Sequence, residues 1–258
     1  MSKFILLTTH RSGTRLLLGS LGSQIQCHKR AFELTIILER FAFDRIKSPF
    51  YHFWSASIKR RAGYILHRKQ LISDFLQELY TPADGVKAIG IRLLYEQADK
   101  HPGILEWAVE NNVGIIHLVR ENSLKAIVYT EACLKRGLFH STSRSEPLTS
   151  IRLSPSRLEM QLTRLTKWIE KYRALLQDTH YLEVSYESLI ANQQAETRRV
   201  LNFLGIDQFA PLTTGLIKRD TDSIEDTIEN FEEVKRASSG TAFEKFFNKD
   251  TTSDKECK

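Results

Sequence analysis

Cysteines are few in this sequence, and their spacing excludes two common kinds of small protein. Cys27, Cys133 and Cys257 are the only three, and no two of them form a C-x-x-C pair. An odd number of widely spaced thiols predicts neither a disulfide framework nor a zinc site. We therefore expect free thiols, no bound metal and a reducing, cytoplasmic environment.

Long hydrophobic runs are also absent. The apolar start at residues 4–7 is followed by Thr8 and Thr9, which end it too early for a signal peptide. No stretch approaches the roughly 18 apolar residues that a membrane-spanning helix needs. We expect no stable membrane insertion.

The charge of the chain is close to balanced, which weakens the case for a nucleic-acid partner. The 258 residues are 41% hydrophobic and 26% charged, values typical of a globular chain that can bury a sizeable core. Lysine and arginine number 37 against 31 acidic residues, so the formal net charge is only +6. The basic residues are dispersed and are not interleaved with aromatic residues in a recognisable motif. Such a surplus suits an anionic small ligand, and we predict no nucleic-acid partner.

Short apolar runs alternate with amphipathic segments along the chain. The spacing predicts strands at residues 4–7, 24–28, 86–93, 113–119 and 181–186. It predicts helices around residues 17–21 and at 36–46, 70–80, 103–111, 121–136, 155–176 and 196–204, with Gly205 ending the last. This alternation is typical of an α/β fold with a central, mainly parallel sheet flanked by helices.

Two segments break the alternation. Residues 138–154 are rich in serine, threonine and arginine and predict a loop, whereas residues 220–233 carry seven acidic residues and predict a solvated surface helix. The polar end of the chain is typical of a frayed tail. We predict one α/β domain at residues 1–247 and a tail at 248–258.

The segment HRSGTRLL, residues 10–17, lies between the first strand and a helix. A helix N-terminus presents unpaired backbone N–H groups and partial positive charge. Gly13 permits close approach of a ligand, while Arg11 and Arg15 add full charges and Ser12 and Thr14 add hydroxyls. The combination predicts an anion-binding turn, the alternative being a capped helix with surface arginines. It is not a Walker A loop, because it has one glycine and no Gly-Lys pair.

Two more positions follow the carboxyl ends of predicted strands. Arg120 comes directly after residues 113–119, and Tyr186 and Glu187 end or follow residues 181–186. Ligands of parallel α/β sheets bind beyond this edge. These positions are therefore candidates for the same kind of site.

Several segments, taken in order, resemble the sulfotransferases that use 3′-phosphoadenosine 5′-phosphosulfate (PAPS). HRSGTRLL is similar to the family's 5′-phosphosulfate loop, and IHLVREN (116–122) to its 3′-phosphate-binding strand end. KAIGIRLLYEQ (87–97) resembles the bacterial, nodulation-type members. LEVSYESL (182–189), RRVLNFLGI (198–206) and ENFEEVKRASSGTAFEKFF (229–247) resemble the family's closing segments. The resemblance implies a single P-loop-like α/β domain.

The resemblance also implies roles for individual residues. Arg11 neutralises charge on the bridging oxygen and 5′-phosphate, and Arg120 binds the 3′-phosphate. The phosphosulfate is held by the rest of the turn, namely Ser12, Gly13, Thr14 and Arg15. No metal is implied, since arginines and helix amides supply the positive charge.

The chain departs from the family pattern at three points. His10 replaces a common proline, and the serine that helps bind the 3′-phosphate is absent, which leaves Tyr129 or Thr130 to supply that hydroxyl. The third departure concerns the general base. Arg30 stands where relatives often carry a glutamate, and arginine cannot take a proton near neutral pH.

Glu33 or His28 is then the candidate base from the sequence, the alternative for both being a structural role. By resemblance we expect sulfuryl transfer from PAPS to a hydroxyl or amine of a small-molecule or glycan acceptor, which residues 59–69 and 138–154 would face. A nucleotide binder that lost its base, or a small-molecule kinase, is the alternative.

Overall fold

The computed structural model describes residues 1–24, 35–36, 67–81, 87–136, 149–207 and 223–247. The chain forms two compact units. The first contains residues 1–119 and 173–217, and the second residues 120–172 and 218–258. The chain thus leaves the first unit at Val119 and returns to it at Arg173.

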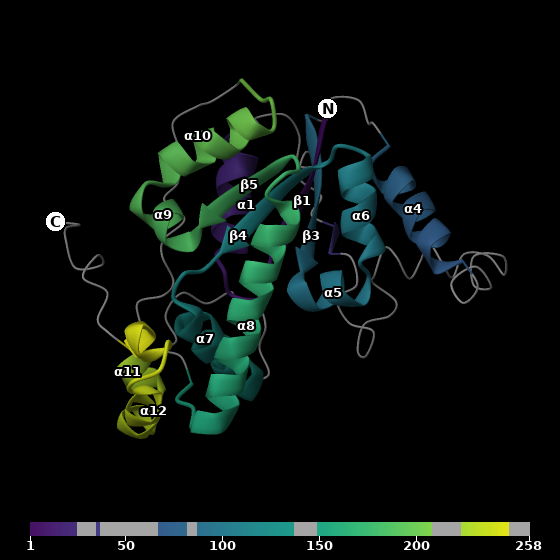
Figure 1. Ribbon diagram of the computed structural model, residues 1–258. Coiled ribbons are helices and arrows are strands. Elements are labelled where there is room, and N and C mark those ends of the chain that lie inside the picture. The colour runs from purple at the N-terminus through teal and green to yellow at the C-terminus, as the bar shows by residue number, and fades with distance from the viewer. Residues whose placement is uncertain (25–34, 37–66, 82–86, 137–148, 208–222, 248–258) are drawn as a thin grey trace. The chain divides into compact units, whose positions relative to one another are not determined.

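The first unit is built on a five-stranded sheet in the order β2-β3-β1-β4-β5 (Figure 1). All four neighbouring pairs are parallel, which confirms the predicted fold class. The carboxyl ends of the strands therefore lie at one edge of the sheet. The strands are β1 (Ser2–Thr8), β2 (Thr35–Ile36), β3 (Ala88–Leu94), β4 (Gly114–Val119) and β5 (Tyr181–Ser185).

Helices cover both sides of this sheet because side chains along a strand point alternately to its two faces. Phe4 and Leu6 belong to one core cluster with Leu17 and Leu21 of α1. That side carries α1 (Thr14–Gln24), α9 (Tyr186–Ala191) and α10 (Gln193–Phe203). The other side carries α4 (Arg68–Leu79) and α6 (Gly103–Glu110), and α5 (Tyr95–Lys100) follows β3 (Figure 1).

Several sequence predictions are confirmed at this level. The predicted strands 4–7, 86–93, 113–119 and 181–186 correspond to β1, β3, β4 and β5. Gly205 follows α10 with a φ of 65°, as expected of a glycine that ends a helix. Two short helices, α5 and α9, have no counterpart in the sequence prediction, because six residues are too few to show a helical period.

A partly buried polar network connects β4 and β5. His117 is its one polar residue within the apolar β4 sequence, so the strand pattern did not predict it. Tyr181 Oη donates to Glu183 Oε2 at 2.9 Å, so it accepts from His117 Nδ1 at 2.8 Å. His117 Nε2 then accepts from Tyr95 Oη at 2.7 Å. Arg173 donates twice to Glu183, each bond measuring 2.7 Å. The network ties β4 and β5 to α5 and to the last turns of the long helix that ends at Leu176.

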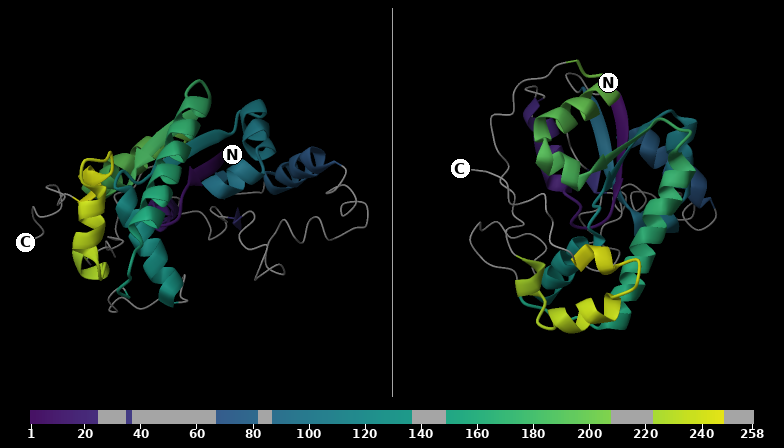
Figure 2. Two further views of the ribbon diagram at one scale, coloured as in Figure 1. Left: turned by 60° about the horizontal axis from the view of Figure 1, so that its bottom comes forward. Right: turned by 60° about the vertical axis from the view of Figure 1, so that its left-hand side comes forward.

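The described part of the second unit is mainly helical (Figure 2). Arg157 Nη2 and Gln161 Nε2 both bind Glu131 Oε1, at 3.0 and 2.7 Å, which joins α8 to α7. Asn122 Nδ2 donates to the Phe246 carbonyl, which joins the start of α7 to η2. The elements are α7 (Ser123–Arg136), α8 (Pro155–Leu176, its last four residues in the first unit), α11 (Ile224–Thr227), α12 (Phe231–Ser238) and the 3-10 turn η2 (Glu244–Phe247).

The prediction of one solvated helix at residues 220–233 is wrong for its described part. The chain forms α11, then an extended Ile228, and only then α12. Ile228 pairs with Ile151 in an isolated parallel bridge, with Ile151 N–H donating to the Thr227 carbonyl and Glu229 N–H to the Ile151 carbonyl. Backbone pairing with a distant segment therefore replaces the helical bonds, and Ile228 is buried.

Other predictions meet the limits of the described residues. Ile36 belongs to β2 rather than to a helix beginning there, because it pairs with Arg92 of β3. The predicted strand 24–28, the rest of the helix 36–46, most of the loop 138–154 and the tail 248–258 lie outside the described residues. The domain boundaries at 1–247 and 248–258 stay a prediction.

Candidate functional site

The turn predicted to bind an anion connects the central strand β1 to α1. β1 ends at Thr8 and α1 begins at Thr14, and the first helical bonds run from Leu16 and Leu17 N–H to the Gly13 carbonyl. The N–H groups at the start of α1 therefore face outward from the helix end. Arg11 is exposed and has a φ of 57°, an unusual conformation for a residue with a side chain. This geometry fits an anion.

Gly13 is required by both conformation and packing. Its φ is 93°, and a Cβ placed there would lie 2.4 Å from Cδ2 of Tyr186. Tyr186 starts α9 directly after β5, and its side chain is buried. The Tyr186 ring thus occupies the space that a side chain at position 13 would need. Tyr186, a candidate site residue from the sequence, therefore packs against the turn.

The hydroxyl of Ser12 points into the protein. Ser12 and Thr8 are both fully buried. Thr8 Oγ1 donates to the Leu118 carbonyl of β4 at 2.6 Å, so the short contact between the Thr8 and Ser12 hydroxyls takes its hydrogen from Ser12. Ser12 therefore fixes the turn to Thr8 at the end of β1, and its hydroxyl hydrogen is used within the protein. Thr14 Oγ1 lies 3.5 Å from Ser12 Oγ.

Several charged side chains of the first unit influence one another around the turn. Burial is the main cause that lowers the pKa of His10; Glu96 opposes the shift, and Arg92 and Arg11 add to it. Burial also lowers the pKa of the Arg92 guanidinium, and Arg15 lowers it further. The turn therefore lies in a region of concentrated positive charge, with Glu96 as the carboxylate that acts on His10. Sequence reasoning did not connect Glu96 with the site.

Arg120 begins the second unit directly after β4. Only 3% of Arg120 is exposed, and its guanidinium carbon lies 5.1 Å from the centre of the Tyr129 ring. Arginine over an aromatic face gains a cation–π attraction that strengthens as water is excluded. Thr130 Oγ1 donates to the Ala126 carbonyl of its own helix at 2.7 Å. Within this unit Arg120 and Tyr129 are thus brought together, while the Thr130 hydrogen is already used.

The candidate general bases cannot be compared with the structure. Glu33 and His28, like Arg30, lie outside the described residues. Residues 59–66 of the predicted acceptor-facing stretch lie outside them too.

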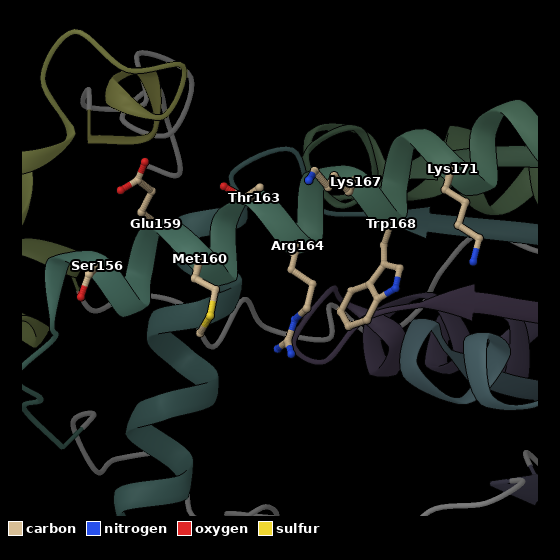
Figure 3. A pocket seen from close by; sticks show the side chains of 8 residues that line it. All are labelled: Ser156, Glu159, Met160, Thr163, Arg164, Lys167, Trp168 and Lys171. Atoms are coloured by element: carbon tan, nitrogen blue, oxygen red, sulfur yellow. The ribbon is translucent and has the colours of Figure 1, made fainter.

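A groove runs along α8 in the second unit (Figure 3). Met160, Arg164, Trp168 and Lys171 follow one another along one side of the helix, and Arg164 lies over the Trp168 ring at 4.9 Å. The remaining lining residues are Ser156, Glu159, Thr163 and Lys167. None of the sequence-predicted site residues lines this groove.

The described part of the chain contains neither a metal-binding cluster nor a membrane-spanning helix. No group of three or more histidine, cysteine or carboxylate side chains in it is arranged to hold a metal ion. None of its helices has the length and hydrophobicity of a membrane span.

The fold and the turn define a class of protein: a parallel α/β protein with a cationic, glycine-containing turn after its central strand. Within this class, residues 91–211 match the model of the sulfotransferase family. The match includes Arg92, Glu96, Arg120 and Tyr129, and the turn precedes it. The predicted resemblance to sulfotransferases is thereby confirmed at the level of the family.

Three solved sulfotransferase structures align with most of the chain. The enzyme from Alicyclobacillus acidocaldarius is 14% identical, with 92% of this chain and 90% of that chain covered and a TM-score of 0.45. The sulfotransferase domain of the Synechococcus PCC 7002 olefin synthase is 17% identical (92% and 86% covered, TM-score 0.41). The domain from the curacin biosynthetic pathway is 16% identical (88% and 82% covered, TM-score 0.43). No curated protein matches the chain.

Proposed function

We propose that this protein transfers a sulfuryl group from PAPS to a hydroxyl or amine of a small-molecule or glycan acceptor. The observation that carries the proposal is the family match at residues 91–211 together with the cationic turn at the carboxyl end of β1. A group transferred with its negative charge needs positioning and electrostatic stabilisation more than covalent chemistry. Arginines and helix amides supply both.

The residues of the turn fit the 5′ end of the donor. Arg11 is exposed, and the charge of Arg15 reaches Arg92 on β3. Gly13 carries no side chain, so the backbone N–H groups at the start of α1 stay accessible to a phosphosulfate. In this proposal Arg11 neutralises charge on the leaving phosphate, and Arg15 and Thr14 hold the anion. Ser12 acts by keeping the turn in place, because its hydroxyl is bonded inside the protein.

Arg120 is proposed to bind the 3′-phosphate, as the resemblance implies. A buried guanidinium forms strong, charge-assisted bonds with phosphate oxygens. Tyr129, whose ring lies against that guanidinium, or Thr130, whose hydroxyl donates to the Ala126 carbonyl, is proposed to supply the hydroxyl of the missing serine. Glu33 and His28 are the candidates for the base that the sequence alone offers, and they stay predictions because both lie outside the described residues.

Arg30, in place of the usual glutamate, favours a second candidate function. In that alternative the chain binds the nucleotide and transfers nothing. Donor binding and turnover therefore have to be measured separately.

Calorimetric titration with adenosine 3′,5′-bisphosphate tests the donor site, with AMP and with ATP plus Mg²⁺ as comparisons. We expect binding that depends on the 3′-phosphate and that Arg120→Ala weakens about 10- to 100-fold, the usual effect of losing charged hydrogen bonds. Arg157→Ala, an exposed arginine of the same unit, is the matched control and should bind as the wild type does. Preference for ATP with Mg²⁺, or no binding at all, would contradict the proposal.

Transfer is tested with radiolabelled PAPS and three probes: water, methyl glucoside and p-nitrophenol. Transfer to any of them supports an enzyme. Tight nucleotide binding without transfer to any probe would instead support the non-catalytic alternative. Unchanged turnover in Glu33→Gln combined with His28→Ala would remove both residues as candidates for the base.

A further inference from the structure

His10 and Glu96 occupy equivalent positions beyond two paired strands. In the parallel pair of β1 and β3, Thr8 is opposite Leu94. His10 follows Thr8 by two residues, and Glu96 follows Leu94 by two residues. Both side chains therefore belong to the edge of the sheet where the anion-binding turn lies.

Glu96 has an unsatisfied oxygen in this position. Its Oε2 atom is shielded from solvent and has no hydrogen-bond partner among the described residues. A buried carboxylate oxygen without a donor is costly unless a positive charge lies near it. Glu96 is one of three charged residues that act electrostatically on His10, the other two being Arg92 and Arg11, so Glu96 lies within electrostatic range of the His10 ring.

The ring nitrogens of His10 are available to a ligand. The side chain is half-buried, and within the described part of the chain no hydrogen bond engages its ring nitrogens. Neutral imidazole can accept a proton from a hydroxyl, and charged imidazolium cannot. Position 10 is also one residue from Arg11, which the proposed function places at the leaving phosphate.

The surrounding charges keep His10 in the form that accepts a proton. Burial lowers the pKa of His10 below its ordinary value of 6.5, and Arg92 and Arg11 act in the same direction. Glu96 alone raises that pKa. His10 is therefore neutral at neutral pH, while Glu96 favours the imidazolium once a proton has arrived.

We propose that His10 is the catalytic residue that takes the acceptor's proton, and that Glu96 is a positioning residue that stabilises the resulting imidazolium. This inference rests on the sulfuryl transfer proposed above. The acceptor O–H proton moves to a ring nitrogen of His10 as the acceptor oxygen bonds to sulfur. The bond from sulfur to the bridging oxygen breaks, and its electron pair stays on the 5′-phosphate. His10 then returns the proton to water.

The test compares His10→Gln and Glu96→Gln with matched surface controls. His180→Gln and Glu110→Gln replace an exposed histidine and an exposed glutamate of the same unit. Sulfuryl transfer from saturating PAPS to methyl glucoside, water and p-nitrophenol is followed from about pH 5 to about pH 9. Affinity for adenosine 3′,5′-bisphosphate and the thermal unfolding midpoint are measured for each variant.

For the wild type we expect kcat with methyl glucoside or water to fall at acid pH, with a midpoint below 6.5. His10→Gln should remove this acid limb and lower kcat about 100-fold or more, the usual contribution of a general base. The loss should be much smaller with p-nitrophenol at high pH, because that acceptor ionises without help. Glu96→Gln should lower kcat and shift the acid limb to lower pH. A structural role would reduce transfer to all probes equally.

Nucleotide binding separates this inference from the proposed function. If the wild type does not bind adenosine 3′,5′-bisphosphate, the sulfotransferase proposal itself fails. If it binds but transfers to no probe, or if folded His10→Gln keeps the wild-type kcat and acid limb, the role of His10 is overturned. An acid limb that does not move in Glu96→Gln overturns the role of Glu96.

Discussion

At the scale of the residue, Gly13 shows how conformation and packing can demand the same side chain. Its positive φ of 93° disfavours any residue with a Cβ. Independently, the Tyr186 ring fills the place where that Cβ would be. The role of Gly13 is predicted from its position in the turn. Its contact with Tyr186 depends instead on the sheet order, in which β5 lies two strands away from β1.

We predict that Gly13→Ala is destabilising and impairs nucleotide binding. Backbone strain alone costs about 1–3 kcal/mol, and the contact of 2.4 Å adds to it because the buried Tyr186 ring must move. Gly205→Ala is the matched control, since Gly205 also has a positive φ but nothing within 4 Å of the added Cβ. Urea unfolding should show a larger loss for Gly13→Ala. Equal losses would show that the Tyr186 contact has no energetic effect.

At the scale of the element, the break between α11 and α12 is held by one asparagine side chain. Asn230 Oδ1 accepts from the Leu153 N–H at 3.0 Å, and Asn230 Nδ2 donates to the Leu153 carbonyl at 2.8 Å. Asn230 is buried, so both groups would otherwise lose water without a replacement bond. The Asn230 side chain thus adds a second pair of hydrogen bonds between these two segments, next to the backbone pairing of Ile151 with Ile228.

We predict that Asn230→Ala destabilises the protein by about 1–3 kcal/mol, because it leaves the Leu153 N–H and carbonyl without these partners. Asn202→Ala, at an exposed position of α10, should be neutral or slightly stabilising, since alanine is the better helix former. Chemical denaturation of both variants checks this. Stability of Asn230→Ala equal to that of the wild type would show that the two hydrogen bonds do not fix this segment.

At the scale of the whole molecule, the network around Glu183 couples stability to pH. His117, whose Nδ1 lies 3.4 Å from Glu183 Oε2, is the largest of the causes that hold the pKa of Glu183 well below its ordinary value, and Arg173 and Tyr181 add to it. Burial lowers the pKa of His117, although Glu183 partly opposes this. In both cases the unfolded chain binds more protons on acidification than the folded chain does.

The free energy of unfolding should therefore fall as the pH drops below 6.5, where His117 is protonated in the unfolded chain, and fall further below 4.5, where Glu183 is. Glu183→Gln should cost about 1–3 kcal/mol at neutral pH and reduce the dependence at acid pH. Urea unfolding at neutral and acid pH measures both.

Glu106→Gln provides the control, because Glu106 forms an exposed ion pair with Lys69 at 2.8 Å. Such pairs contribute about 0–1 kcal/mol, so this variant should keep the wild-type pH dependence. A Glu183→Gln variant with an unchanged pH dependence would exclude the network as its cause.

The sequence by itself determined those features that are encoded locally. The apolar runs of β1, β3, β4 and β5 predicted a parallel α/β fold, and residues 10–15 and Arg120 were placed at strand ends because a strand and the turn after it are contiguous. The family resemblance came from the same contiguous segments. The base candidates Glu33 and His28 also came from local motif spacing, and they stay predictions.

Only the tertiary structure decided what depends on contacts between distant segments. Pairing of β1 with β3 places Glu96 and His10 at equivalent positions beyond two adjacent strands, and the Ile151 bridge divides a segment whose periodicity predicts one helix. The sequence predicts that the Ser12 hydroxyl donates to a ligand, whereas in the structure this buried hydroxyl forms its hydrogen bond within the protein. Local periodicity carries no information on strand order or on which side chains lose water, so these relations become visible only when the sheet is assembled.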